Sequence, residues 1–524
     1  MTDFSRRALL AGILLIYLAL AVLFAVYTPA WQAPDEPAHY NYVRHLAEHG
    51  RFPVLQAGDY PHDYLERIKS QKFPPELSID PIRYEFHQPP LYYLLATPVY
   101  WLAGGRLMGV RLFSALLGGG IVLLAYAIGR RVFGARSALA LGQSPGLALG
   151  AAAFVALLPQ HLATVAQVGN DVLAELLYAA LLYLLATWVM APQAGHGKGQ
   201  ASLHTAARPA RGLVALGVLL GLILIAKTTA YIALPLAGGA LLWLWRRERA
   251  SARRILAEIA LIAAPAAVIA LPWYIRNTAV YGWPDFLGLI RHDQIVIGQM
   301  RLADFIAQYG WVAYWRRGVE WTFKSFWGIF GWMGAWMDSR AYFVLALTSS
   351  VVAAGLALRG AWPLQPDRGA RPTPHTLRTT HYALRTTHYA IRLLVISAGL
   401  TLLTYAWYNA QFVQHQGRYL FTALIQIGLA FAAGWERALI PRNSRILAAG
   451  LVIFAIVLAG WGVLTQAGLP KWPLALTAAI AAGLAVRPWL PRRLDPLLFG
   501  LPFAGLPLLA LYALFGVIVP QLAR

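Results

Sequence analysis

Long apolar runs recur along the whole chain, and many approach the roughly 20 residues that an α-helix needs to cross the hydrocarbon core of a bilayer. Inside a bilayer every backbone N–H and C=O has to be paired within the protein, and a helix does this within one segment. Hydrophobic residues make up 59% of the chain and charged residues only 13%, whereas a soluble domain carries about a quarter charged residues. The sequence therefore predicts an all-α, polytopic integral membrane protein.

We count about 13 candidate spans, with edges uncertain by several residues. Their approximate ranges are 8–28, 109–129, 138–158, 171–190, 212–226, 230–246, 255–275, 341–360, 392–411, 418–436, 446–465, 473–488 and 498–519. The first run follows two arginines and begins like a signal peptide, but it is too long for one and no small-residue cleavage site follows. We expect it to be retained as a membrane helix.

The basic residues, which give a formal net charge of +22, gather in short segments between apolar runs. This pattern indicates membrane topology, so nucleic acid is not an expected partner. Placing all these segments in the cytoplasm gives a consistent alternation with the amino terminus inside. The chain has no Cys, which excludes disulfides and thiolate metal sites. The basic segments are Arg6–Arg7, Arg130–Arg136, Arg246–Arg254, Arg359–Arg392, Arg437–Arg445 and Arg487–Arg493.

Two outer segments, about 29–108 and 277–340, are unusually long connectors, and long loops are often functional. In the first, Pro89–Ala103 is too short to span comfortably and is rich in Tyr, which predicts an interfacial helix. The second is rich in Trp, which favours an interfacial aromatic belt over a sugar-stacking surface. Its tryptophans are Trp311, Trp315, Trp321, Trp327, Trp332 and Trp336.

One inner segment, about 362–391, contains a tandem repeat of LRTTHYA at 377–383 and 384–390. Its period of seven has no apolar seam, which excludes a coiled coil. Because it also follows a Pro- and Arg-rich stretch, we predict a disordered insertion.

The motif Pro34-Asp35-Glu36-Pro37-Ala38-His39-Tyr40 lies a few residues beyond the first span. If a helix begins here, Asp35 and His39 share a face at i and i+4, which suits an acid/base pair or a shared metal ion. Alternatively, Asp35 only caps the helix and Glu36 only favours its first turn. The residues alone leave both interpretations open.

A second polar position, Asn170-Asp171, opens the fourth span, where helix capping is again an alternative. Glu175 lies one turn further on the same face and inside the span, and an ionisable residue at that depth is a functional-site hypothesis.

Several cations break the inner-face pattern, because they lie at the outer ends of spans. Snorkelling explains any one of them. As a set they indicate an anionic partner such as a lipid phosphate or pyrophosphate, since Arg and Lys are the usual phosphate ligands. They are Lys227, Arg276 beside Asn277, and Arg418 in Gln416-Gly417-Arg418-Tyr419.

The acidic motif in a long first outer loop, followed by His87-Gln88-Pro89-Pro90-Leu91-Tyr92-Tyr93, resembles the GT-C superfamily of glycosyltransferases that use lipid phosphosugars. That superfamily includes protein O-mannosyltransferases and aminoarabinose transferases. The chain is closer still to an uncharacterised bacterial membrane-protein family with a PDEPAH motif, a later SFWG-x-FGW segment (325–332 here) and a GRY segment (417–419 here). The resemblance covers residues 1 to about 436 and predicts a GT-C-like catalytic module there, whereas the helices of 437–524 are nonspecific.

The resemblance implies site residues, because in GT-C proteins the acid of the first loop is catalytic. This carries over to Asp35, with Glu36 as the second acid of the pair and Asp171 as an acid that assists with the acceptor or a metal. Asp35, His39 and Asp171 would be the ligands of a divalent cation (Mg²⁺, Mn²⁺ or Zn²⁺). The substrate-binding residues implied are His39, His87, Asn170, Asp171, Lys227, Arg276, Gln416 and Arg418.

The implied reaction transfers a sugar, with inversion, from a polyprenyl-phosphate donor to a glycan, lipid or protein acceptor at the outer face of the bacterial cytoplasmic membrane. A transporter or flippase is one alternative, although no inverted repeat of interrupted spans is visible. A noncatalytic membrane scaffold that retains the fold is the other.

Overall fold

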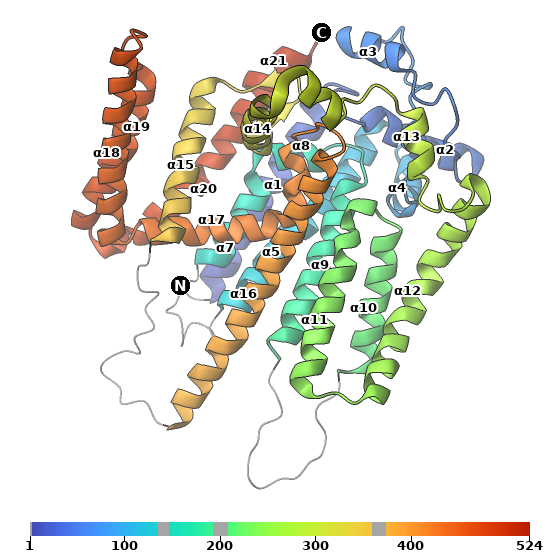
Figure 1. Ribbon diagram of the computed structural model, residues 1–524, viewed down its shortest axis with the longest axis horizontal. Helices are drawn as coiled ribbons and strands as arrows, with labels where there is room; N and C mark the ends of the chain where they lie inside the picture. Colours follow the sequence, from blue (N-terminus) through green and yellow to red (C-terminus); the bar gives the residue numbers. More distant parts are fainter. Residues whose placement is uncertain (1–2, 135–145, 192–207, 359–373) are drawn as a thin grey trace.

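The computed structural model describes residues 3–134, 146–191, 208–358 and 374–524, with side chains from residue 385 onward in the last range. It consists almost wholly of helices that run alongside one another (Figure 1). Within these ranges the only strands are β1 (Ile329–Phe330) and β2 (Ala335–Trp336), which form an antiparallel hairpin. The predicted all-α fold class is confirmed.

Ten helical segments in the described ranges are long and apolar enough to cross a membrane, and a bent pair, α7 (Gly146–Leu157) with α8 (Pro159–Val165), would make eleven. The chain is a multi-pass integral membrane protein. The ten segments are α1 (Asp3–Tyr27), α5 (Leu107–Phe133), α9 (Asp171–Val189), η1 with α11 (Thr228–Ile232, Ala233–Glu248), α12 (Ala252–Tyr281), α15 (Ser339–Ala357), α16 (Pro374–Asn409), η2 with α17 (Gly417–Ala423, Leu424–Ala438), α18 (Pro441–Leu464), and Arg492–Leu522 with α20 (Asp495–Tyr512), the π-helix η5 (Ala513–Ile518) and α21 (Val519–Leu522).

The predicted count of 13 spans is not confirmed, although each predicted run overlaps a helix. Two of the runs form helices of only 15 and 16 residues, α10 (Ala210–Leu224) and α19 (Lys471–Val486). A third is interrupted at Pro159, where α7 and α8 meet at a bend of 62°. Leu158 has ψ of 120°, since a residue before proline is driven out of the helical region. The short connections η3 (Arg487–Trp489) and η4 (Arg492–Leu494) follow α19.

Small residues bring the helices of the bundle close together. A side chain at Gly217 of α10 would place its Cβ 2.2 Å from the carbonyl oxygen of Ile262 in α12, and Gly221 faces the same helix one turn on. Gly355 of α15 meets the backbone of Gly434 in α17 in the same way. Such close approach increases van der Waals contact between the helices. This contact matters in a membrane, because lipid provides no hydrophobic driving force for helix association.

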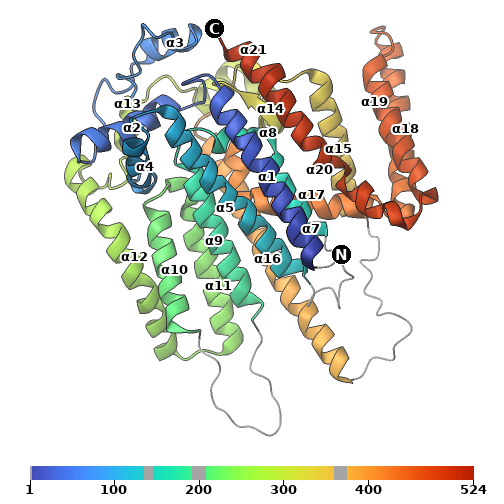
Figure 2. The ribbon, with the colours of Figure 1, turned by 180° about the vertical axis from the view of Figure 1, so that it is seen from behind.

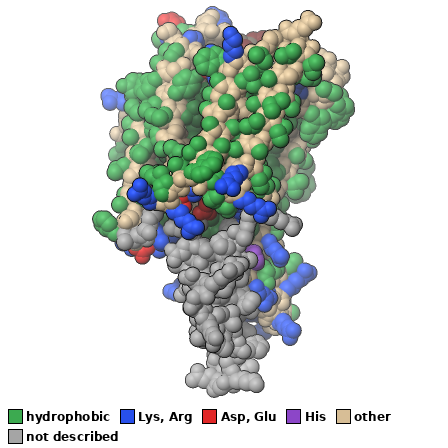
Figure 3. Space-filling view, turned by 90° about the vertical axis from the view of Figure 1, so that its left-hand side faces the viewer, with side chains coloured by type: hydrophobic (Ala, Val, Ile, Leu, Met, Phe, Trp, Pro, Cys, Tyr) green, Lys and Arg blue, Asp and Glu red, His purple; other side chains and the backbone are tan. Residues whose placement is uncertain are grey.

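The helices of both long outer segments gather at one end of the bundle, which we call the loop end (Figures 1 and 2). The first segment forms α2 (Glu36–His49), α3 (His62–Ser70) and α4 (Leu91–Leu102), and α4 is the short helix predicted within 89–103. The second forms α13 (Leu289–Ile295) and α14 (Leu302–Gly328). On the side of the bundle in Figure 3, hydrophobic side chains cover the surface and Lys and Arg collect toward the opposite end.

The tryptophans of the second outer segment lie in different environments. Trp311 and Trp315 are exposed on α14, as expected of an aromatic belt, while Trp327 is buried. Trp332 donates a hydrogen bond to the carbonyl oxygen of Trp31, so it fastens the second segment to the first. Much of this aromatic content therefore builds the loop end itself.

The predicted disordered insertion at 362–391 is wrong for its second half, because α16 begins at Pro374 and includes both copies of the repeat. The copies carry helix-compatible residues without a Gly or Pro, and they continue directly into the apolar part of the helix. Residues 362–373 lie outside the described residues.

The last helices pack in the same core as the first. Phe503, Leu506 and Leu522 belong to one buried cluster with Tyr17 and Phe24 of α1, and Figure 2 shows α20 beside α1. By contrast, the hairpin of α18 and α19 stands at the edge of the bundle (Figure 1). The predicted division at residue 436 remains a prediction, but α20 and α21 are part of the main body.

Candidate functional site

A buried ion pair fixes the start of the first outer loop. Arg111 of α5 donates to both carboxylate oxygens of Glu36, at 2.8 and 2.6 Å, and also to the carbonyl oxygens of Ala25 and Thr28 at the end of α1. Glu36 is completely buried and accepts two further bonds from the backbone N–H groups of Trp31 and Val168. All the acceptor capacity of Glu36 is used to hold the loop, which favours a structural role, and its predicted role in catalysis stays a prediction.

Asp35, the adjacent acid, faces the other way. It occupies the N-cap position of α2, yet its carboxylate makes no cap hydrogen bond, which removes the capping interpretation. Its Oδ1 accepts from the Tyr84 hydroxyl at 2.9 Å, and its Oδ2 pairs with Arg418 Nη2 at 2.9 Å. Its backbone is left-handed, with φ of 67°, an uncommon conformation that Asp tolerates better than most residues.

The charge on Asp35 is stabilised despite burial. Burial would raise the pKa of this carboxyl group, but the Arg418 guanidinium and the Tyr84 hydroxyl outweigh it and lower the pKa below its ordinary 3.8. Asp35 is consequently an ionised carboxylate at neutral pH.

The SFWG and GRY motifs meet and position Arg418. The Gly417 N–H donates to Ser325 Oγ at 2.7 Å, and a Cβ on Gly417 would lie 2.3 Å from the backbone nitrogen of Phe326. Only glycine permits this contact between η2 and α14. Arg418 then lies between Asp35 and Gln416, whose Oε1 accepts from Arg418 Nε at 2.7 Å.

A second ion pair lies near the first, between Lys227 Nζ and Asp171 Oδ1 at 2.7 Å. Lys227 lies in extended backbone between α10 and η1, and Asp171 is the first residue of α9. Asn170 also makes no cap bond; its Nδ2 donates to Gln88 Oε1 at 3.2 Å and to the Ala226 carbonyl at 3.4 Å. Both polar side chains thus serve the site and not the helix end.

His39 links the two ion pairs. Its imidazole is buried, its Nδ1 lies 2.8 Å from the Tyr93 hydroxyl, and the charges of Asp35, Asp171 and Lys227 all act on it. Burial lowers the pKa of His39 from 6.5, so the imidazole is neutral at pH 7. Three charged side chains, Asp35, Asp171 and Lys227, therefore act on a neutral polar centre, and Arg418 pairs with one of them, Asp35.

Of the other two predicted residues, His87 lies beside this group and Arg276 does not. His87 is buried, its ring is tilted against that of His292 with centroids 4.5 Å apart, and its Nδ1 contacts the Tyr84 carbonyl. Arg276 does not join the site: its guanidinium donates to the carbonyl of Pro53 at 2.5 Å and lies over the Trp273 ring at 5.0 Å. Arg276 fastens the first loop to α12.

The predicted metal site is not supported by this geometry. Across the part of the chain that the structure describes, no three His, Cys, Asp or Glu side chains come close enough to hold a metal ion. Asp35 and Asp171 each face a cation instead. We therefore derive no step through a metal.

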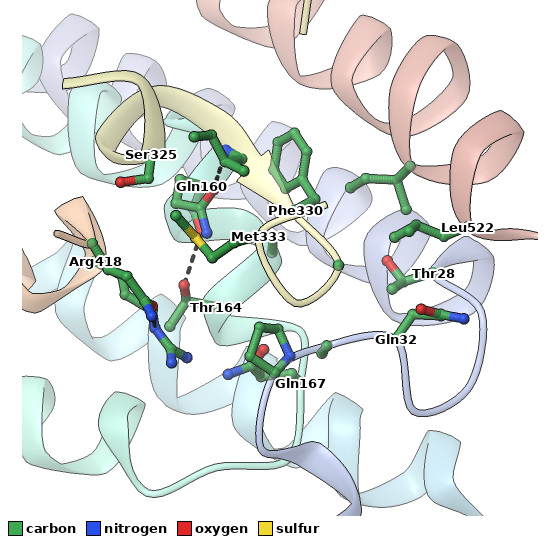
Figure 4. A pocket seen from close by; sticks show the side chains of 17 residues that line it. Thr28, Gln32, Gln160, Thr164, Gln167, Ser325, Phe330, Met333, Arg418 and Leu522 are labelled. Carbon is green, nitrogen blue, oxygen red and sulfur yellow. Dashed lines mark hydrogen bonds between the residues drawn. The ribbon is translucent and has the colours of Figure 1, made fainter. Parts of the chain in front are cut away.

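A pocket opens beside Arg418 (Figure 4). It is partly open to solvent. The loop after α1, the bent helix α8, the β1–β2 hairpin and the end of the chain at Leu522 form its walls. Arg418 is shared between the Asp35 pair and this pocket.

Three residues of this region were missed from sequence: Arg111, which pairs with Glu36, Tyr84, which contacts Asp35, and Gln32, which lines the pocket. Arg111 could have been found, because an arginine within the predicted span 109–129 is an intramembrane charge that needs a partner. Tyr84 and Gln32 carry no such signal. The predicted Glu175 faces His161 at 3.2 Å, below the Asp171 pair.

These observations define the class of protein. It is a multi-pass membrane protein in which two ion pairs, Asp35–Arg418 and Asp171–Lys227, lie at one end of the helix bundle. Its fold resembles that of solved GT-C proteins. For ArnT from Cupriavidus metallidurans in the apo state the TM-score is 0.50 at 18% identity, over 97% of this chain and 77% of that one. For the same protein bound to undecaprenyl phosphate the TM-score is 0.48 at 17% identity, over 96% and 77%. The Archaeoglobus fulgidus oligosaccharyltransferase in the apo form gives a TM-score of 0.42 at 12% identity, over 94% and 56%.

The chain is thus a membrane protein with a GT-C-like fold, as its motifs predicted. No model of a known protein family matches the sequence, and no curated protein does. The closer resemblance to the PDEPAH family rests on the quoted motifs alone.

Proposed function

We propose that this protein is an inverting glycosyltransferase that moves a sugar from a polyprenyl-phosphate donor to an acceptor hydroxyl. The reaction would take place at the outer face of the bacterial cytoplasmic membrane, with the loop end outside and the amino terminus inside. The observation that carries this proposal is that Asp35, Asp171, Lys227 and Arg418, distant in sequence, form two neighbouring ion pairs beside His39.

The two cations are suited to a lipid phosphate. Arg418 and Lys227 are each neutralised by a single carboxylate, and their side chains are only 12% and 15% exposed. A phosphate group entering between them would replace these carboxylates as the partner of both cations, through charge-assisted hydrogen bonds. The departing polyprenyl phosphate would keep that stabilisation as the glycosidic bond breaks.

Asp35 is the base in this proposal. Its carboxylate takes the proton of the acceptor hydroxyl, the acceptor oxygen bonds to the anomeric carbon, and the bond from that carbon to the phosphate oxygen breaks. Attack from the face opposite the phosphate inverts the anomeric carbon. Transfer of Arg418 from Asp35 to the donor phosphate would also make Asp35 a stronger base, because its main cationic partner leaves.

The proposal predicts that Arg418→Ala and Lys227→Ala each weaken binding of undecaprenyl phosphate. Loss of a charge-assisted hydrogen bond of roughly 1.5–3 kcal/mol corresponds to about a 10- to 150-fold rise in Kd. Binding is measured by fluorescence titration of the full chain in nanodiscs. Arg276→Ala serves as the control, since its guanidinium is bound to loop carbonyls, and it should leave Kd within about twofold. Unchanged binding in both site variants would remove the lipid phosphate from this site.

A pH dependence follows from the Asp35–Arg418 pair. Because Arg418 lowers the pKa of Asp35 below 3.8, the acid limb of kcat/KM should lie below pH 4 in the wild type. Arg418→Gln removes the cation, so burial dominates, the pKa of Asp35 rises, and the acid limb moves toward neutral pH. Lys227→Gln, which changes a cation that does not act directly on Asp35, should leave the limb in place. If the acid limb of kcat/KM lies at the same pH in the wild type, Arg418→Gln and Lys227→Gln, Asp35 is excluded as the titrating base.

A further inference from the structure

The pocket beside Arg418 differs in chemistry from the charged group next to it. Its lining contains four glutamines (Gln32, Gln160, Gln167 and Gln416), and Arg418 is its only ionisable residue. Resting on the function proposed above, we propose that this pocket binds an uncharged glycosyl unit, either the sugar of the donor or a sugar of a glycan acceptor.

Unpaired amide groups in the lining point to a hydroxyl-bearing ligand. Gln32 is 3% exposed, and its buried Nε2 has no hydrogen-bond partner in the described structure. Buried polar groups left without partners are costly, and most find one. Gln160 uses Oε1 to accept from the Ile329 N–H at 3.0 Å, which leaves its NH₂ group to donate. Amides both donate and accept, as vicinal sugar hydroxyls do.

The charges of the lining favour a neutral sugar. No carboxylate lines the pocket, so the ammonium group of an amino sugar would find no counterion and would lie near the Arg418 guanidinium. An anionic sugar would have to compete for Arg418 with Asp35, 2.9 Å away. An uncharged polyol neither needs a counterion in the pocket nor competes with Asp35 for Arg418.

Apolar side chains also line the pocket, among them Phe330, Met333 and Leu522 (Figure 4). Phe330 and Met333 come from the β1–β2 hairpin, where Gly331 and Met333 adopt positive φ of 54° and 66°. A sugar ring carries C–H groups on its faces and hydroxyls on its rim, so a lining that combines apolar side chains with amides matches both.

The test compares four ligands with the full chain in nanodiscs: undecaprenyl phosphate, undecaprenyl-phosphoryl glucose, undecaprenyl-phosphoryl aminoarabinose, and maltotriose as a soluble neutral glycan. The variants are Gln32→Leu and Gln167→Leu. Gln71→Leu is the matched control, because Gln71 is an exposed glutamine of the same loop. Thermal unfolding checks that each variant is folded.

If the pocket holds the donor sugar, the Kd of the glucose-bearing lipid rises at least about tenfold in both site variants, while that of undecaprenyl phosphate changes less than about twofold. If it holds an acceptor sugar, maltotriose binding shows the tenfold loss instead. Gln167→Glu, which adds a counterion, should shift preference toward the aminoarabinose lipid.

The inference is overturned if neither neutral ligand loses affinity in the folded variants, or if the wild type binds the aminoarabinose lipid as tightly as the glucose lipid. Failure of the proposed function looks different: undecaprenyl phosphate itself then fails to respond to Arg418→Ala and Lys227→Ala. If one site variant does not fold, the other variant and the wild-type ligand comparison still decide the question.

Discussion

Replacing Asp35 by Asn is expected to abolish sugar transfer while the protein remains folded and inserted. The substitution keeps the size of the side chain, and an amide oxygen can still accept from the Tyr84 hydroxyl at its present distance of 2.9 Å. The amide cannot take a proton from an acceptor, and loss of a general base costs typically about 10²–10⁴-fold in rate. Turnover is measured by mass spectrometry of the glycosylated product from a lipid-linked donor.

The control for this prediction is Asp63→Asn, an exposed acid of the same loop, which should retain full turnover. The amide also ends the ion pair with Arg418, so donor binding is measured separately. With its carboxylate partner gone, Arg418 should bind undecaprenyl phosphate at least as tightly as in the wild type. Wild-type turnover by Asp35→Asn would exclude Asp35 from the mechanism.

The helical architecture could be predicted because lipid imposes a simple rule on sequence. A run of apolar residues near the bilayer thickness becomes a helix, and every predicted run does overlap one. The number of membrane spans was harder to predict, because local breaks decide whether an apolar run forms one helix long enough to cross the bilayer. The bend at Pro159 and the short α10 and α19 leave ten candidate spans among the described residues, or eleven with the bent pair.

The candidate site was predictable in its residue types but not in its pairings. Conspicuous acids and misplaced cations indicated Asp35, Asp171, Lys227 and Arg418, yet the Asp35–Arg418 contact joins residues 383 positions apart. No periodicity extends over such a distance. The different roles of Asp35 and Glu36 could not be predicted either, because a one-residue step at the start of α2 turns Asp35 toward Arg418 and Glu36 toward Arg111 of α5.

Replacing Glu36 by Ala is expected to destabilise the folded protein and not merely to inactivate it. The change leaves Arg111, whose side chain is 3% exposed, as a buried cation with no counterion, and it frees the N–H groups of Trp31 and Val168. Breaking a buried pair by removing one partner costs about 3–5 kcal/mol. We expect a lower Tm in nanodiscs and a smaller yield of monodisperse protein, with the same result for Arg111→Ala.

Glu66→Ala is the matched control, since Glu66 pairs with Lys69 on the surface of the same loop and is 51% exposed. An exposed pair contributes about 0–1 kcal/mol, so this variant should unfold at nearly the wild-type temperature. The comparison of Tm between Glu36→Ala and Glu66→Ala decides whether Glu36 has a structural role. A structural Glu36 lowers the Tm when it is removed, whereas a catalytic one would leave the Tm unchanged and turnover lost. The second result would restore the role in catalysis that the buried contacts with Arg111 argue against.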